Sequence, residues 1–175
     1  MFATLPASSV LAEGQGAYFY RDSHVRRLAR ENVSCDELVN AFFHALPPWV
    51  DTLMKWRDGL VERLGLKTSA SAPHEALAQG PIKLGQQIGV FRVLALAPGE
   101  VVLGENDRHL DFRVSLMAGQ SEFRVSTLVR PHNVFGWFYL ACVLPFHHFI
   151  SALSTSRVAR LLNAGSYRQE KSQNP

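Results

Sequence analysis

The chain has 175 residues, of which 47% are apolar and 19% are charged, a composition typical of a folded domain and not of a disordered or fibrous chain. Its net charge of +3 comes from four basic residues against one acidic residue in the segment 151–175, so the remaining residues are neutral overall. This distribution lacks the clustered basic face of nucleic-acid-binding proteins, and we expect no nucleic-acid partner. We predict a single domain over residues 1–175, with a folded core over 17–164, a mobile loop over 67–80 and a frayed tail over 165–175.

The cysteines and the N-terminus indicate a cytoplasmic protein. Cys35 and Cys142 match no metal-binding or redox spacing, so we expect buried, reduced thiols. The first residues lack the positive charges and the long apolar run of a signal peptide, so secretion is not expected. The uncharged run 134–153 is about as long as a membrane span, but Pro145 and the pair His147 and His148 interrupt it, and we expect no stable membrane insertion.

The first part of the chain predicts one strand and two short helices. Residues 17–28 are rich in aromatic and β-branched side chains, as strands are. Ser34 and Glu37 have the spacing of a capping box, which predicts a helix that starts there and ends before Pro47 and Pro48. A second helix should follow, because large apolar residues recur at helical spacing: Trp49, Leu53, Trp56, Leu60 and Leu64.

From residue 86 the apolar pattern changes to a period of two, which predicts four antiparallel strands joined by tight turns. Turns at 97–100, 106–107 and 119–120 pair the following residues: Leu96 with Val101, Leu94 with Leu103, Leu103 with Leu110, Val101 with Phe112, Leu116 with Phe123, Val114 with Val125 and Phe112 with Thr127. All three hairpins then present one apolar face, which we expect to be buried. The opposite face is polar and should be an exposed lattice of ion pairs, with His109, Asp111, Arg113, Ser115, Arg124, Ser126 and Arg130.

After Pro131 the pattern becomes helical as far as about Ala164, with His132 or Asn133 as the N-cap and a kink at Pro145. The first half of this helix is apolar all round, so we expect it to be covered on more than one side. These elements predict an α+β fold of the helix-grip type. In it an antiparallel β-sheet carries a long kinked C-terminal helix across its apolar face, and two short helices follow the first strand.

Several segments resemble one known family. They are 103–115 (LGENDRHLDFRVS), Ser126 and Thr127 with Val129, Asn133, Gly136, Tyr139 and Pro145 to His147, together with Leu46 to Val50 and Leu66 to Lys67. With these segments the chain resembles, over about 17–164, a bacterial domain-of-unknown-function family, number 2867 in that series. In its order of elements the family resembles the START-like helix-grip superfamily. The resemblance implies no established activity, but some members are attached to short-chain-dehydrogenase-like proteins, which suggests an oxidoreductase-type partner protein.

The apolar face should end in a polar group. We expect Arg92 to point inward opposite Glu105, and Glu105 to lie opposite Arg108, which places a carboxylate between two guanidinium groups. This arrangement is either a structural ion pair or an anchor for the acidic head of an apolar ligand. The candidate residues of the remaining ligand-binding wall are Trp49, Leu53, Trp56, Phe112, Thr127, Trp137, Tyr139 and His147.

We predict no metal and no cofactor, and we assign no catalytic residue from the sequence. His147 and His148 are adjacent on a helix, so they point about 100° apart and cannot ligate one metal ion in the usual i, i+4 manner. His109, Asp111 and Ser115 share one strand face and look like a catalytic group, but that face is the one opposite the apolar layer.

The favoured hypothesis is that the domain binds a small hydrophobic molecule between the sheet and the C-terminal helix without transforming it. One alternative is a cyclase- or hydrolase-like enzyme with Glu105 or His147 as the base and Arg92 as an oxyanion stabiliser. The other is a protein-interaction module or homodimer that uses the helix surface of Trp137, Phe138 and Phe146.

Overall fold

The computed structural model describes residues 5–29, 32–47 and 80–164. Within them the chain forms a six-stranded antiparallel sheet in the order β1-β6-β5-β4-β3-β2 with a long C-terminal helix across it, which confirms the α+β class. The second helix predicted after the first strand, residues 67–79 of the loop predicted over 67–80, and the predicted tail lie outside the described residues. The elements are η1 (Gln15–Ala17), β1 (Tyr20–Arg27), α1 (Cys35–Ala45), β2 (Gln87–Ile88), β3 (Phe91–Ala97), β4 (Glu100–Asn106), β5 (Leu110–Ala118), β6 (Glu122–Pro131) and α4 (Val134–Ala164).

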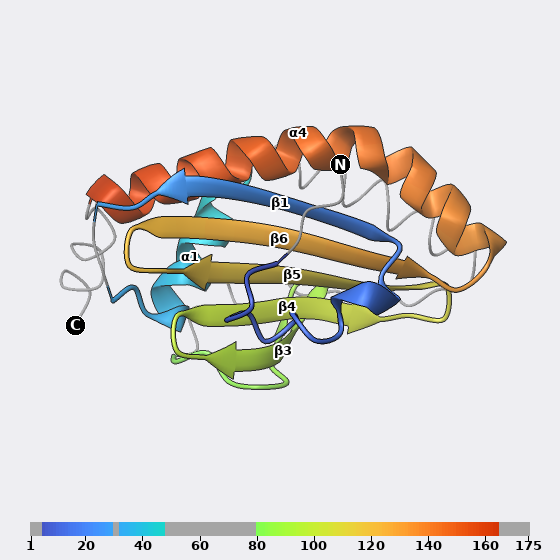
Figure 1. Cartoon of the computed structure of the whole chain (residues 1–175), viewed down its shortest axis with the longest axis horizontal. Coiled ribbons are helices and arrows are strands. Elements are labelled where there is room, and N and C mark those ends of the chain that lie inside the picture. The colour runs from blue at the N-terminus through green and yellow to red at the C-terminus, as the bar shows by residue number, and fades with distance from the viewer. Residues whose placement is uncertain (1–4, 30–31, 48–79, 165–175) are drawn as a thin grey trace.

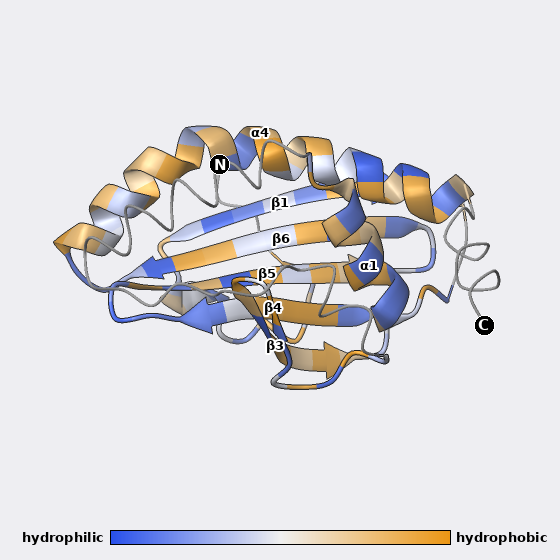
Figure 2. Cartoon of the chain, turned by 180° about the vertical axis from the view of Figure 1, so that it is seen from behind, coloured by the Kyte–Doolittle hydropathy of each residue, from blue (hydrophilic) through white to orange (hydrophobic). Residues whose placement is uncertain are grey.

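Different parts of the chain cover the two faces of the sheet. The N-terminal segment 5–19 lies in front of the sheet in Figure 1, on the face that we call the outer face. Figure 2 shows the sheet from behind, where α1 lies in front of the opposite, inner face. The helix α4 runs along the sheet beside β1 and β6, and its C-terminal half also contacts α1. The main core therefore lies between the inner face, α1 and the second half of α4.

Strands β4, β5 and β6 pair in a different register from the one predicted, yet the same side chains of these three strands face inward. Leu103 lies opposite Val114 and not Leu110, because the β4–β5 loop is longer than a two-residue turn. Leu116 lies opposite Val125 and not Phe123. These shifts are of four and two residues. Since side chains alternate along a strand, a shift by an even number preserves the inward face.

A bulge in β3 changes the register by one residue. Leu96 lies opposite Val101 as predicted, but after an irregularity between Val93 and Ala95 it is Val93 that lies opposite Leu103. Arg92 is therefore paired with Gly104 and not with Glu105. A one-residue shift moves a side chain to the other face of the sheet, so Arg92 is not an inward residue of the ladder.

The outer face is buried over much of its area, and the prediction of an exposed ion-pair lattice is wrong. Asp111, Ser115 and Ser126 are at most 5% exposed, and Leu128 is fully buried on the same face. The reason is the N-terminal segment, which is bonded to the outer face through Glu100. The pairing of Asp111 with Arg130 is present, at 2.6 Å.

The predicted capping box of α1 is present. Ser34 Oγ accepts a hydrogen bond from the Glu37 amide at 3.2 Å, and a Glu37 carboxylate oxygen accepts one from the Ser34 amide at 2.9 Å. The helix ends at Ala45, before Pro47, as expected from the restricted backbone of a residue that precedes proline. Its buried side chains include Leu38, Val39 and Phe42, which pack into the main core.

Asn133 and Gly136 hold the N-terminus of α4 against the β4–β5 loop. Asn133 Oδ1 accepts a hydrogen bond from the Gly136 amide at 3.1 Å and lies 3.0 Å from Nδ1 of His109. A Cβ on Gly136 would clash with the His109 carbonyl oxygen. The close approach of helix and loop thus requires glycine at this position. From there α4 continues through Pro145 to Ala164 and is bowed along its length (Figure 1).

The first half of α4 exposes many apolar side chains, so the prediction that it is covered on more than one side is wrong. The described elements pack on one side of it, and Cys142, predicted to be buried, is an exposed free thiol. By length and composition α4 meets the requirements of a membrane-crossing helix, and only 17% of its most apolar window is buried. One such helix is by itself weak evidence of a membrane span. The exposed large apolar residues of α4 are Val134, Phe135, Trp137, Phe138, Phe146 and Phe149.

Candidate functional site

Strand β1 places three polar side chains on the inner face of the sheet. Tyr20, Asp22 and His24 alternate along the strand, and they lie opposite Val129, Thr127 and Val125 of β6. Because the side chains of a strand alternate between the two faces, all three point to the same side as the core residue Val125. This side is the one that faces α4.

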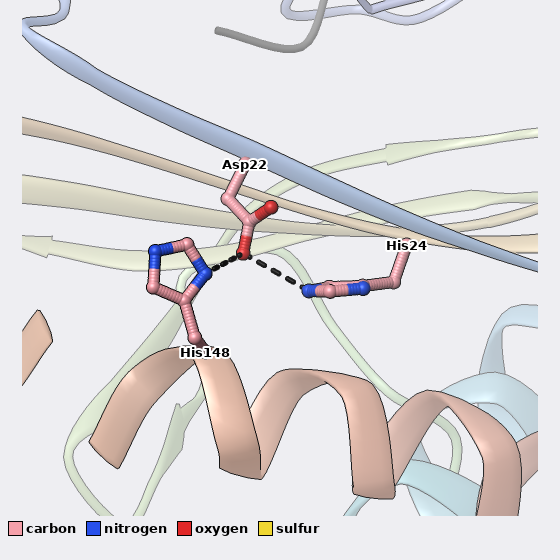
Figure 3. Close-up of side chains that lie close together, drawn as sticks. All are labelled: Asp22, His24 and His148. Carbon is pink, nitrogen blue, oxygen red and sulfur yellow. Dashed lines mark hydrogen bonds and ion pairs between the residues drawn. The ribbon is translucent and has the colours of Figure 1, made fainter. Parts of the chain in front are cut away.

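The helix α4 brings two histidines and a serine to these side chains. His148 Nδ1 lies 3.5 Å from Oδ2 of Asp22, and His24 Nε2 lies 3.0 Å from the same oxygen (Figure 3). His147 Nε2 lies 3.9 Å from that oxygen. Although adjacent helical residues diverge, both histidines therefore reach the single carboxylate of Asp22. We call this group the polar cluster; it consists of Tyr20, Asp22, His24, His147, His148 and Ser151.

Hydroxyl groups hold the rings of both histidines. The Tyr20 hydroxyl lies 3.4 Å from Nε2 of His148, and Ser151 Oγ lies 3.1 Å from Nε2 of His147. The Tyr20 ring also meets both imidazoles edge-on, with centroid distances of 5.7 Å and 5.8 Å. These contacts order the side chains before any ligand binds.

The surroundings of the polar cluster shift two pKa values. Burial lowers the pKa of His147 to about 4, despite the attraction of Asp22, so this imidazole is neutral at neutral pH. Burial, and after it the Asp22 carboxylate, raises the pKa of Tyr20 well above its ordinary value, so its hydroxyl stays protonated. The cluster can therefore form hydrogen bonds with a polar group. Asp22, His24 and His148, whose ligand atoms lie within 4.8 Å of one another, could also hold a metal ion.

Some of the predicted ligand-binding residues lie at this cluster or on the same face. His147 belongs to it, and Thr127, which is 6% exposed, lies opposite Asp22. Phe112 also lies on the inner face, where its ring meets that of Phe91 at a centroid distance of 5.7 Å. Tyr139 is a half-buried residue of α4.

Other predicted residues lie elsewhere. Arg92 and Glu105 form an ion pair of 3.6 Å, but it is a partly exposed pair on β3 and β4. The residue opposite Glu105 is Phe112 and not Arg108, because of the longer loop. Trp137 is 44% exposed and packs against Phe19, which precedes β1. Trp49, Leu53 and Trp56 lie outside the described residues.

The two catalytic arrangements considered from the sequence do not form. Glu105 lies on β4, three strands from the β1 strand that His147 contacts, which is roughly 14 Å at the usual strand spacing. On the outer face, Ser115 donates a hydrogen bond to Glu100, whereas Asp111 pairs with Arg130 and His132. These groups have structural partners and do not form a triad.

Sequence reasoning missed Tyr20, Asp22, His24, His148 and Ser151. One signal was available, because the first three alternate along a segment that already reads as a strand. Their meeting with α4 depends on the pairing of β1 with β6, which no local pattern reveals.

Comparisons with known proteins place the chain in a family. No curated protein and no solved structure gives a significant match. The family described as "Protein of unknown function (DUF2867)" matches residues 15–153, a range that contains every residue of the polar cluster. Since this match spans well over half of the sequence, the chain belongs to the DUF2867 family.

Proposed function

We propose that the domain binds a small apolar molecule between the inner face of the sheet and the first half of α4, without transforming it. The single observation that carries this proposal is the contrast between the two halves of α4. Of its residues 134–147, only Gly136 and Leu140 are buried. In the second half the helix is closed against the core by Ser151, Ser154, Thr155, Val158, Ala159 and Leu162. The buried core of the described residues therefore involves mainly the second half of α4, and we infer that the ligand occupies the apolar layer between the first half and the sheet.

The polar cluster lies where these two halves meet, and it supports an anchoring role. Its hydroxyl and imidazole groups, on Tyr20, His147 and Ser151, can form hydrogen bonds with a polar atom of the ligand. The Asp22 carboxylate disfavours an anionic head group, and Arg92 lies at the other side of the sheet. The ligand that fits is therefore an apolar body with an uncharged hydroxyl or carbonyl group. The arrangement of sheet and final helix, which resembles the START-like helix grip, is a second support.

The test begins with native mass spectrometry of the purified full chain, followed by solvent extraction of any retained compound. An apolar compound at near-unit stoichiometry supports the proposal. If the protein is empty, binding of the uncharged fluorescent dye Nile red is measured instead. An empty protein that also fails to bind Nile red contradicts ligand binding at this site.

Two matched tryptophan variants locate the bound dye. Val143 is half-buried and continues the inward stripe of Gly136 and Leu140, whereas Phe149 is 62% exposed on the same helix. V143W should fill the layer and weaken dye binding about tenfold or more, a loss of about 1.4 kcal/mol. F149W should bind the dye as the wild type does. Binding that survives V143W but disappears in an F138S/F149S variant would show that the dye sits on the outside of α4.

The exposed rings of α4 favour a second candidate function, a homodimer. Trp137, Phe138 and Phe146 are 44%, 65% and 52% exposed, and clustered apolar surface of this kind is typical of interfaces. Sedimentation velocity of the wild type and of F138S/F146S tests this candidate. A concentration-dependent dimer that the variant abolishes supports it, and a monomeric wild type contradicts it.

A further inference from the structure

We propose that Asp22, His24 and His148 bind one divalent transition-metal ion. Their three ligand atoms, Oδ2, Nε2 and Nδ1, lie within 4.8 Å of one another (Figure 3). The proposal goes beyond the binding of an apolar molecule and does not depend on it.

The distances suit a metal ion of the size of Zn²⁺. Zinc binds imidazole nitrogen and carboxylate oxygen at about 2.0–2.2 Å, so two ligands at a tetrahedral angle lie roughly 3.4 Å apart. Asp22 Oδ2 is 3.0 Å from the His24 nitrogen and 3.5 Å from the His148 nitrogen. Only the two imidazoles need to move closer together, and the His148 side chain is 55% exposed.

Two elements far apart in the sequence hold the ligands. Asp22 and His24 are two positions apart on one face of β1, and their side chains are 13% and 23% exposed. His148 comes from the middle of α4, which packs along β1. A bound ion would therefore link the final helix to the edge strand of the sheet and stabilise the folded state.

The surroundings of His148 fit a metal ligand. When its Nδ1 coordinates a metal, its Nε2 carries the proton and needs an acceptor, and the Tyr20 hydroxyl oxygen lies 3.4 Å away. Metal-binding histidines regularly donate their second ring N–H in this way, which fixes the tautomer and the ring orientation. Tyr20 is thus a positioning residue of the proposed site.

The ligand set indicates the class of metal. Two imidazole nitrogens with one carboxylate oxygen suit Zn²⁺ and other divalent first-row ions, whereas Mg²⁺ and Ca²⁺ prefer all-oxygen sites. Three protein ligands leave a position for water, as in catalytic zinc sites. His147 Nε2, 3.9 Å from the shared Asp22 oxygen, lies close enough to contact such a water.

The experiment titrates the untagged, chelator-treated full chain with Zn²⁺ by calorimetry, with Mg²⁺ in parallel. We expect one Zn²⁺ per chain, no Mg²⁺ binding and a rise in Tm with Zn²⁺, since a ligand of the folded state stabilises it by mass action. Loss of a residue that hydrogen-bonds a metal ligand lowers metal affinity roughly 10- to 100-fold, so we expect Y20F to lower the Zn²⁺ affinity by roughly 10-fold. Loss of a ligand itself should have a larger effect, which we expect for each of D22N, H24Q and H148Q. Co²⁺ bound in place of Zn²⁺ should show a visible d–d spectrum that H148Q removes.

The matched control is H44Q, which removes a histidine of α1 outside the polar cluster. If Zn²⁺ binds only to scattered surface histidines, H44Q should lower the Zn²⁺ affinity as much as H148Q does. Equal losses in these two variants would overturn the proposal. So would a wild type that binds no Zn²⁺. H148Q keeps the test valid if D22N fails to fold, because the His148 side chain is 55% exposed. Nile red binding, measured with and without Zn²⁺, tests ligand binding in the apolar layer independently of the metal site.

Discussion

Ser9 Oγ donates a hydrogen bond of 2.7 Å to Oε1 of Glu100, a residue 91 positions later in the chain. Ser115 Oγ donates to the same oxygen, and the Val10 amide donates to Oε2 at 2.9 Å. Glu100 is 2% exposed, so its carboxylate depends on these three donors. The bond between Ser9 and Glu100 thus ties the N-terminal segment to the outer face, part of which this segment covers.

Substituting Glu100 should destabilise the fold. E100A leaves the donors of Ser9, Val10 and Ser115 without their acceptor, and Ser9 and Ser115 are buried, so we expect a loss of about 2–4 kcal/mol in the free energy of unfolding. Urea denaturation measures this loss. E122A, which removes a 48% exposed carboxylate, is the control and should cost at most about 1 kcal/mol. Equal losses in the two variants would show that the N-terminal segment is not held by Glu100.

Gly136 should not tolerate a side chain. In G136A the new Cβ meets the His109 carbonyl oxygen, so the helix or the loop must move, and we expect a loss of about 1–3 kcal/mol. G16A is the matched control, because a Cβ at Gly16 meets nothing within 4 Å, and its effect should stay within about 0.5 kcal/mol. Thermal and urea unfolding of both variants check the prediction. A G136A protein as stable as the wild type would mean that α4 does not approach the loop this closely.

Asp111 should make part of the stability dependent on pH. Burial by itself raises the pKa of this carboxyl, but hydrogen bonds from His132 and Arg130 outweigh it and hold the pKa below its ordinary value. A carboxylate with a lowered pKa stabilises the folded state above the pKa that it has when unfolded. This contribution is lost as the pH falls below about 4.

The variant D111N tests this dependence. Its deficit in unfolding free energy relative to the wild type should be largest near neutral pH and should shrink at roughly pH 3. Urea denaturation at several pH values gives the deficit, and E122Q controls for the loss of one exposed negative charge. A deficit that is constant over the whole range would rule out the lowered pKa.

The cap of α1 should contribute measurably to stability. S34A removes the acceptor for the Glu37 amide and should cost about 1 kcal/mol. S34D retains an acceptor at the N-cap and should restore most of that loss. Chemical denaturation compares the three proteins. If S34D is no more stable than S34A, loss of the N-cap hydrogen bond is not the cause of the destabilisation in S34A.

Much of the fold follows from local patterns. The capping box of Ser34 and Glu37 placed the start of α1, and the change to a period of two placed β3 to β6. The inward face of β4, β5 and β6 was predicted correctly although the pairing of Leu103 and Leu116 was not, because both registers shift by an even number of residues. The register of the strands depends on the length of the β4–β5 loop and on the bulge after Val93, and no local sequence pattern predicts either feature.

The candidate site was much less predictable. His147 and Thr127 were named, but their neighbours Asp22 and His24 belong to a strand whose place in the sheet the sequence left open. The burial of Glu100 likewise depends on a segment 90 residues earlier in the chain.

By itself the sequence determined where α1 begins, where β3 to β6 and α4 lie, and which side of β4, β5 and β6 is apolar, because these properties arise from neighbours within a few positions. Only the tertiary structure decided that β1 pairs with β6 at the edge of the sheet, that the N-terminal segment covers part of the outer face, and that α4 carries His148 to Asp22. The physical reason is that these contacts join residues about 90 to 130 positions apart, and their formation depends on the packing of the whole chain and on no local periodicity.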